Sequence, residues 1–144
     1  MLTKEILRIK GGTLYTVGPA AQLAEAVDTM VAYDIGSLVV MDHGRLTGML
    51  TFREVLRALT GAGGALGGRR VEEVMVREPT VVGADVEVDE LRRIMLDTRV
   101  RYVPIMDGTT LVGVLSFHDV ARAVLEEQGF ENRMLKGYIK NWPE

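Results

Sequence analysis

The stretch "GMLTFREVLRAL" at residues 48–59 recurs as "GVLSFHDVARAV" at residues 113–124, with six of the twelve positions identical. The match extends beyond these two stretches. Sliding the chain by 65 places aligns residues 14–59 with residues 79–124 without a gap, and thirteen of the 46 positions are identical. Several identities fall on glycine and aspartate in turn sequences, which amphipathic patterning alone would not match. The chain therefore contains a duplicated supersecondary unit.

Each copy predicts the same order of elements. Apolar residues recur at helical spacing in residues 23–31 and again in residues 88–96. A short β-branched run follows each helix, "SLVVM" at 37–41 and "YVPIM" at 102–106, and such runs are typical of buried strands. A turn with Asp and Gly then leads into a returning strand and a second helix. We predict an α+β fold of two β–α–β–β–α units, whose first helices face the core with Leu23, Ala26, Val27, Met30 and Val31, and with Val88, Leu91, Ile94, Met95 and Leu96.

Composition and charge narrow the class of protein. The 144 residues are enough for one ordinary domain with a core, and 47% hydrophobic with 26% charged residues is a globular composition. A net charge of −3 without a basic stripe predicts no nucleic-acid partner. The absence of cysteine excludes disulfides and thiolate metal sites. The N-terminus matches neither a signal peptide nor a lipidation motif, and no apolar run reaches membrane length, so we expect a cytoplasmic protein with no membrane contact.

The glycine-rich stretch "TGAGGALGGRR" at residues 60–70 separates the two copies. A phosphate-binding loop would need Gly-Lys-Ser/Thr at the start of a helix, whereas two arginines follow here. We therefore predict a flexible linker. The predicted organisation is a first unit at residues 1–60, a linker at 61–70, a second unit at 71–127 and a C-terminal amphipathic helix at 128–144.

The C-terminal segment differs from both copies. Its large apolar residues fall three and four apart and predict one stripe on a helix, made of Phe130, Met134, Leu135, Tyr138, Ile139 and Trp142. The paired units are complete without this helix. Two interpretations therefore stay open: the stripe packs back on its own domain, or it packs against a second copy of the chain.

The repeated "G-h-h-T/S-x-x-E/D-h" ending (h, hydrophobic), the "YVPIMD" strand and the "VEEVM…PTV" lead-in together resemble a pair of CBS domains, also called a Bateman module. The resemblance covers residues 4–127, and "ILRIKGGTLYTV" further resembles the opening of stand-alone bacterial members. It implies two units packed sheet to sheet about a pseudo-twofold axis, with two clefts for adenosine-containing ligands such as AMP, ADP, ATP, NAD or S-adenosylmethionine. It also implies a sensor that needs no cofactor, forms a homodimer and signals to an unidentified target protein.

Ser116-x-x-Asp119 and Thr51-x-x-Glu54 stand where a strand gives way to a helix. Both pairs fit a capping box, in which hydroxyl and carboxylate satisfy the free NH groups of the first turn. Both also fit a ligand site, because the same NH groups and the helix dipole attract a phosphate. The resemblance implies that the acidic residue binds the ribose. The family has aspartate there, so Asp119 matches, whereas Glu54 is one methylene longer.

The resemblance places further contacts around the same clefts. The base would lie against the backbone before the family's "PV" pair, which here means Arg101 and Tyr102 ahead of Pro104. Because proline lacks an NH, we expect that strand to be an edge strand or to end there. By the same carry-over, the Asp119 site draws its adenine contacts from the other copy and its lead-in, namely from Lys10, Gly11, Gly36 and Ser37.

The set of candidate ligand contacts is therefore Ser116, Asp119, His118, Lys10, Gly11, Gly36, Ser37, Thr51, Glu54, Arg101, Tyr102, Pro104, Met75 and Thr80. Among the basic residues, Arg53, Arg99, Arg101 and His118 fit either phosphate contacts or ordinary solvent exposure. No metal site is predicted, because His118 and Asp119 are adjacent and adjacent side chains on a helix point apart.

Two other classes of function can be compared with a sensor, and for the first of them, an enzyme, our prediction is negative. An enzyme would need a nucleophile and a base, but the only histidines, His43 and His118, belong to no Ser-His-Asp order. The alternative to a sensor is a protein-interaction module whose clefts are degenerate. Ligand-shifted melting with AMP, ATP, NAD and S-adenosylmethionine separates these interpretations, because an interaction module would respond to none of them.

Overall fold

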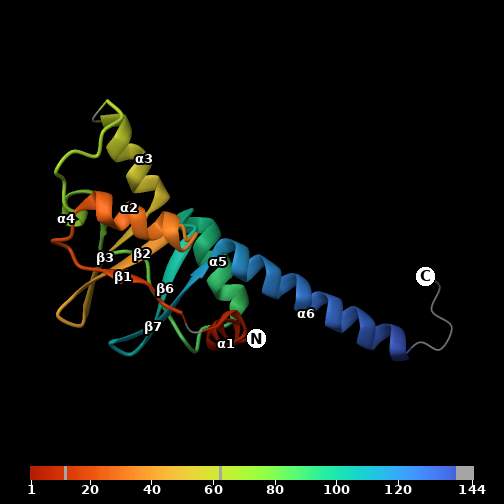
Figure 1. Ribbon diagram of the computed structural model, residues 1–144. Helices are drawn as coiled ribbons and strands as arrows, with labels where there is room; N and C mark the ends of the chain where they lie inside the picture. Colours follow the sequence, from red (N-terminus) through yellow and green to blue (C-terminus); the bar gives the residue numbers. More distant parts are fainter. Residues whose placement is uncertain (12, 62, 139–144) are drawn as a thin grey trace.

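The computed structural model describes residues 1–11, 13–61 and 63–138. It contains two small sheets, each covered by helices, and a long helix that leaves the body of the molecule at the C-terminal end (Figure 1). The elements are α1 (Thr3–Lys10), β1 (Thr16–Val17), α2 (Leu23–Ala32), β2 (Ser37–Asp42), β3 (Arg45–Thr51), α3 (Phe52–Gly61), α4 (Val71–Val74), β4 (Val76–Arg77), β5 (Val82–Gly83), α5 (Val88–Thr98), β6 (Tyr102–Asp107), β7 (Thr110–Ser116) and α6 (Phe117–Tyr138).

The two sheets repeat the same topology. The first sheet has the order β1-β2-β3-β4 and the second the order β5-β6-β7. In both sheets a short first strand runs parallel to the first strand of the hairpin, β1 to β2 and β5 to β6. The hairpins share their register, and both have an irregularity after the third buried residue, between Val40 and Met41 and between Ile105 and Met106. The duplication therefore extends to single residues, and the predicted α+β fold with its β–α–β–β–α units is confirmed.

Each unit is completed by a segment that precedes the other copy in the chain. Helix α1 packs on the second unit, where the NH of Thr3 donates to the carbonyl of Val86 over 2.8 Å and Ile6 is buried in that unit's core. Helix α4 packs on the first unit, where Val71 is buried in the core. Strand β4 then pairs with β3. Boundaries drawn along the chain at residues 60 and 71 therefore do not coincide with the packing.

We call α1 and α4 the exchanged helices, because each packs on the unit formed by the other copy. The exchanged segment crosses the sheet of that unit next to the glycine that opens the repeated motif. A Cβ on Gly48 would lie 2.5 Å from the sulfur of Met75 and 2.8 Å from the carbonyl oxygen of Val76. A Cβ on Gly113 would lie 2.6 Å from Cδ2 of Leu7. Only a residue without a side chain allows this close approach. The glycine identity between the copies thus reflects the same helix exchange in both units.

Pro104 corrects one expectation from the sequence. It lies in β6, the central strand of its sheet, so the prediction of an edge strand or a strand end was wrong. The matching residue, Val39, donates its NH to the carbonyl of Tyr15 over 3.4 Å, a bond that proline cannot make to Thr80. Pairing with the parallel neighbour accordingly begins only at Ile105, so a central strand tolerates the proline.

The core and the last helix depart from the sequence prediction in two places. Val31 is 76% exposed and Leu96 57% exposed, because each lies at the edge of its predicted stripe, beyond the reach of the sheet. Helix α6 runs without interruption from Phe117 to Tyr138, so the second unit's last helix and the predicted C-terminal helix are continuous. The described side chains do not include those of the predicted apolar stripe, and Ile139 and Trp142 lie outside the described residues altogether. Within the described part of the chain, no helix is both long and apolar enough to cross a membrane.

The glycine-rich stretch is tied down at its C-terminal end. The guanidinium of Arg69 donates to the carbonyls of Ala58, Ala65 and Leu66 over 2.8 to 3.0 Å, which holds the loop against α3. Gly63, with φ of +65°, supplies a left-handed turn that most residues would resist. The prediction of a flexible linker took no account of this anchoring arginine.

Candidate functional site

Two cavities lie where the units meet, each bounded by the start of one unit's second helix and by parts of the other unit. The Asp119 cleft has a volume of about 880 Å³ and is lined by residues that include Lys10, Gly36, Ser37, Ser116 and Asp119. The Glu54 cleft has a volume of about 720 Å³ and is lined by residues that include Thr51, Glu54, Arg57, Thr80 and Arg99. Both volumes fall in the range of small-molecule sites in proteins.

Ser116 and Asp119 form a complete capping box at the start of α6. The NH of Ser116 donates to Oδ2 of Asp119 over 2.9 Å, and the NH of Asp119 donates to Oγ of Ser116 over 3.1 Å. The capping-box interpretation of this motif is therefore confirmed. It leaves the hydroxyl hydrogen of Ser116 free to serve a ligand, since the hydroxyl oxygen is acting here as an acceptor.

Lys10 adds a third partner from α1. Its Nζ lies 2.8 Å from Oδ2 of Asp119 and donates to the carbonyl of Val114 over 2.9 Å. Burial raises the pKa of the Asp119 carboxyl, but the hydrogen bonds from Lys10 and Ser116 outweigh it, so that pKa lies below its ordinary value. A carboxylate that faces a cleft and stays ionised at neutral pH is a strong acceptor for hydroxyl donors.

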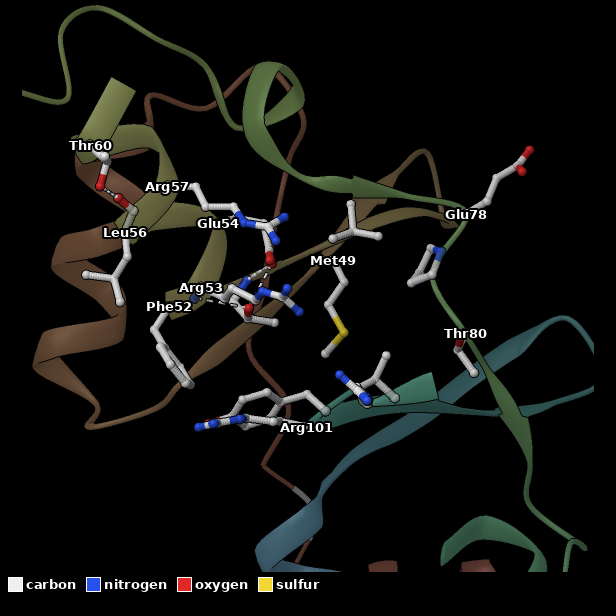
Figure 2. A pocket seen from close by; sticks show the side chains of 16 residues that line it. Met49, Phe52, Arg53, Glu54, Leu56, Arg57, Thr60, Glu78, Thr80 and Arg101 are labelled. Atoms are coloured by element: carbon white, nitrogen blue, oxygen red, sulfur yellow. Dashed lines mark hydrogen bonds between the residues drawn. The ribbon is translucent and has the colours of Figure 1, made fainter. Parts of the chain in front are cut away.

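Glu54 uses the same position in the first copy differently. Its Oε1 accepts both the NH and the hydroxyl of Thr51, each over 2.8 Å, and the residue is only 8% exposed. The dashed lines in Figure 2 show this folded-back arrangement. Both acidic residues accept the NH of their cap residue, but only Glu54 also accepts the cap hydroxyl, so the hydrogen of the Thr51 hydroxyl is already used. The two acidic residues of the duplicated motif are therefore not equivalent.

Phe52, Arg101 and Tyr102 form the wall between the clefts, because all three line both cavities. The Phe52 and Tyr102 rings meet edge to face with centroids 6.3 Å apart, and Cζ of Arg101 lies 5.5 Å from the centroid of Phe52. A Cβ on Gly36 would collide with the Tyr102 phenol, so this glycine makes room for a side chain. Burial raises the pKa of the Tyr102 phenol, which therefore stays a neutral hydrogen-bond donor at neutral pH.

The structure brings most of the predicted site residues together. The Asp119 cleft contains Lys10, Gly11, Gly36, Ser37, Arg101, Tyr102, Ser116, His118 and Asp119. The Glu54 cleft contains Thr51, Glu54, Thr80, Arg101 and Tyr102. Two predicted residues lie elsewhere. Met75 is buried against Gly48 in the first core, and Pro104 is buried within β6, so both serve packing instead of lining a cleft.

Sequence reasoning overlooked Phe52 and Arg57, although both were visible as identities between the copies. Phe52 matches Phe117, and Arg57 matches Arg122. The identity at the first position of the helix was the signal for Phe52, because Phe52 and Phe117 both line the cleft beside their own cap, whereas Arg122 does not line the Asp119 cleft.

The two histidines lie apart. His43 is 93% exposed in the first hairpin turn, with Nδ1 2.7 Å from Asp42, whereas His118 lines the Asp119 cleft. Across the described residues, no group of three His, Cys, Asp or Glu side chains is arranged to hold a metal ion. The groups that face the clefts are suited to binding: a carboxylate, hydroxyls, basic side chains and aromatic rings.

The comparisons with known proteins agree with this geometry. The model of the CBS domain matches residues 5–61 and 71–126. The CBS domain-containing protein CBSX3, mitochondrial, of Arabidopsis thaliana is 31% identical over 121 residues, which cover 81% of this chain and 59% of that protein. The chain thus spans about three fifths of the length of this relative.

Solved structures show the same fold. The CBS-domain containing protein ATU1752 from Agrobacterium tumefaciens has a TM-score of 0.81 and 33% identity, covering 85% of this chain and 98% of that one. The CBS domain pair of protein MJ0100, in complex with 5′-methylthioadenosine and S-adenosyl-L-methionine, has a TM-score of 0.78 and 25% identity. The match covers 88% of this chain and 98% of that one. With two matches of the family model that together cover most of its length, the chain belongs to the CBS domain family.

Proposed function

We propose that this protein is a regulatory module that binds adenosine-containing ligands in its clefts and relays their presence to a partner protein. The observation that carries the proposal is Asp119, an ionised carboxylate that faces a cavity of about 880 Å³ beside the hydroxyl of Ser116 and the start of α6. The MJ0100 pair was solved with two adenosine-containing ligands, which supports this class of ligand.

The geometry suits each part of such a ligand. Asp119 accepts the ribose hydroxyls, because no hydrogen bond to its Oδ1 is found among the described residues. The Ser116 hydroxyl and the first turn of α6 face a phosphate. Gly36 and Ser37 supply backbone from the first unit for the base, next to the neutral phenol of Tyr102.

A ligand in this cleft would touch both units at once. Ser116 and Asp119 belong to the second unit, Gly36 and Ser37 belong to the first, and Lys10 ends the exchanged helix α1. The ligand therefore acts on the relative position of the units. It biases that position only by the difference in its affinity for the two arrangements, typically about 1–3 kcal/mol of coupling.

Isothermal titration calorimetry with AMP, ATP, NAD and S-adenosylmethionine tests the proposal. At least one of the four should bind, and Asp119→Asn should weaken that binding because it removes the charge while preserving the shape of the side chain. Asp107→Asn, at the exposed last residue of β6, is the control. Indifference to all four ligands would leave the protein-interaction module as the function.

We also propose that the protein assembles as a homodimer through α6. This helix projects from the body of the molecule (Figure 1), and Leu125 on its described part is 67% exposed. A further family member, a CBS-CP12 protein from bloom-forming cyanobacteria, is described as hexameric, so self-association occurs among proteins of this fold. Deletion of residues 129–144 should therefore weaken self-association, which sedimentation velocity measures.

A further inference from the structure

The Glu54 cleft holds an excess of positive charge. Arg53 and Arg57 lie four residues apart on α3, and Arg99 lies across the cavity at the end of α5. Figure 2 shows Arg53 and Arg57 extending from α3 into the cavity. Throughout the described residues, none of these three guanidinium groups has a carboxylate oxygen within 4.0 Å.

The acidic residues of this cleft do not offset the arginines. Glu54 is buried and accepts two hydrogen bonds from Thr51. Glu78 turns its carboxylate away from Arg53 and Arg57, as Figure 2 shows. Apolar side chains form much of the remaining lining, among them Met49, Leu56 and Val76. Such apolar walls lower the local dielectric and strengthen the field of the arginines.

The Asp119 cleft lacks this excess of positive charge, because Lys10 and Arg101 are matched there by Asp34 and Asp119. Asp34 stands there where the Glu54 cleft has Arg99, and both residues adopt a left-handed backbone, with φ of +52° and +58°. The side chains of Asp34 and Arg99 therefore start from equivalent backbone positions and carry opposite charges. Likewise His118 stands where the other cleft has Arg53, and the cation Lys10 is already paired with Asp119.

Arginines that line one cavity and have no carboxylate partner among the described residues suit a chain of phosphates. Each Arg offers a planar fork of donors that matches phosphate oxygens, and three of them exceed what a single phosphate needs. Arg101 lines both clefts and therefore does not distinguish them. The difference between the clefts thus resides in Arg53, Arg57 and Arg99.

We propose that the Glu54 cleft binds a polyphosphate group through Arg53, Arg57 and Arg99, and that the Asp119 cleft takes ligands with no more than one phosphate. The nucleoside part of this inference rests on the function proposed above, whereas the polyphosphate part rests on the arginines alone. The protein would then compare a nucleoside triphosphate in one cleft with a nucleoside monophosphate in the other.

The test is calorimetry of the full chain with ATP, AMP and inorganic tripolyphosphate. Arg53→Gln combined with Arg57→Gln should weaken ATP binding by at least about tenfold, since each variant removes charge-assisted bonds to phosphate, and should change AMP binding less than about twofold. Arg122→Gln is the matched control, because Arg122 occupies the equivalent position of α6 and pairs there with Glu126 over 3.2 Å. Unchanged ATP binding in the double variant would overturn the inference.

A charge exchange sharpens the test. Arg99→Asp gives the Glu54 cleft the residue of its counterpart, on a backbone that aspartate adopts readily, and should remove the preference for ATP over AMP. Asp34→Arg should raise the affinity of the Asp119 cleft for ATP relative to AMP, because it supplies one of the three arginines of the other cleft. If neither exchange alters the preference, the inference fails even where AMP still binds and the proposed function stands.

The remaining outcomes separate the two proposals. Arginine-dependent binding of ATP and tripolyphosphate without any binding of AMP would support the polyphosphate site and contradict a nucleoside sensor. Tripolyphosphate binding as tightly as ATP would identify an inorganic chain as the ligand, and tighter ATP binding would identify a nucleotide. Binding of AMP and ATP with equal affinity at both clefts of the unmodified chain would contradict the inference.

Discussion

Lys10 and Asp119 form an ion pair of 2.8 Å between the end of α1 and the first turn of α6. The cation comes from the exchanged helix and the carboxylate from the unit that receives it. The residue proposed to bind ribose is therefore also the residue that fixes the end of α1. A ligand that binds Oδ1 of Asp119 shares this carboxylate with Lys10, which holds Oδ2, so occupancy of the cleft is coupled to the position of α1.

The first prediction concerns Asp119→Ala. The variant loses the acceptor for the ribose hydroxyls, and a hydrogen bond to a charged group contributes about 1.5–3 kcal/mol, so AMP affinity should fall roughly ten- to a hundredfold. Titration calorimetry measures the change, with Asp107→Ala as the control. AMP binding at wild-type affinity would contradict the assignment of Asp119.

The second prediction concerns Lys10→Met and pH. Removing Lys10 takes away the largest of the interactions that lower the pKa of Asp119, so that pKa should rise. With its pKa held below the ordinary value of 3.8, Asp119 contributes stability that is present above about pH 3.8 and is lost as the pH falls through the folded-state pKa. Lys10→Met should therefore unfold at a higher pH than the wild type.

Carbon-13 NMR titration of the Asp119 carboxyl and acid unfolding followed by circular dichroism measure these two effects. Lys4→Met is the control, because Lys4 pairs with Asp85 over 3.0 Å at an exposed site. An unchanged Asp119 pKa in Lys10→Met would show that the ion pair is absent in solution.

The third prediction compares the two motif glycines. Gly48→Ala should cost roughly 1–3 kcal/mol of unfolding free energy, because the new methyl group meets the backbone oxygen of Val76 as well as Met75. Gly113→Ala should cost less, because it meets only the end of the flexible Leu7 side chain. Urea denaturation of both variants gives the difference, and Leu7→Ala should reduce the cost of Gly113→Ala. Equal costs at the two sites would contradict the described crossings.

The fourth prediction concerns assembly. Deleting residues 129–144 should leave a folded pair of units with weaker self-association, because it removes the projecting part of α6. Sedimentation velocity measures the association, and Leu125→Lys offers a milder change on the exposed surface. If the truncated chain is as dimeric as the full chain, the interface lies on the units themselves.

Much of the fold could be predicted from the sequence because it repeats locally. The alignment of the copies specifies the hairpins, their register and the helices, since each depends on residues close together in the chain. The position of Pro104 was predicted wrongly because we applied the rule that confines proline to edge strands or strand ends. That rule does not foresee that the parallel neighbour begins pairing only at Ile105.

The lining of the clefts was predictable where a motif marked it or where the family resemblance carried a position over, as for Lys10 and Gly36. The Ser-x-x-Asp motif predicts that Ser116 and Asp119 cap a helix. The close contact between Gly36 and Tyr102 could not be predicted in this way, because it depends on how the units meet. The exchange of α1 and α4 was not predictable either, because helical periodicity shows that a face is buried without showing which unit buries it. The charge reversal between Asp34 and Arg99 becomes meaningful only once both are known to line matching cavities.

The exchange of α1 and α4 also bears on how such a chain arose. A single copy of the unit would leave the surface above its motif glycine uncovered until a second copy supplied the missing helix, as in a domain-swapped dimer. Gene fusion of two such copies turns that reciprocal exchange into an intramolecular one, with a high effective concentration in place of diffusion. Fusion also frees the two copies to differ, because each cleft then has its own lining: carboxylates and cations balance at Asp119, whereas arginines outnumber glutamates at Glu54.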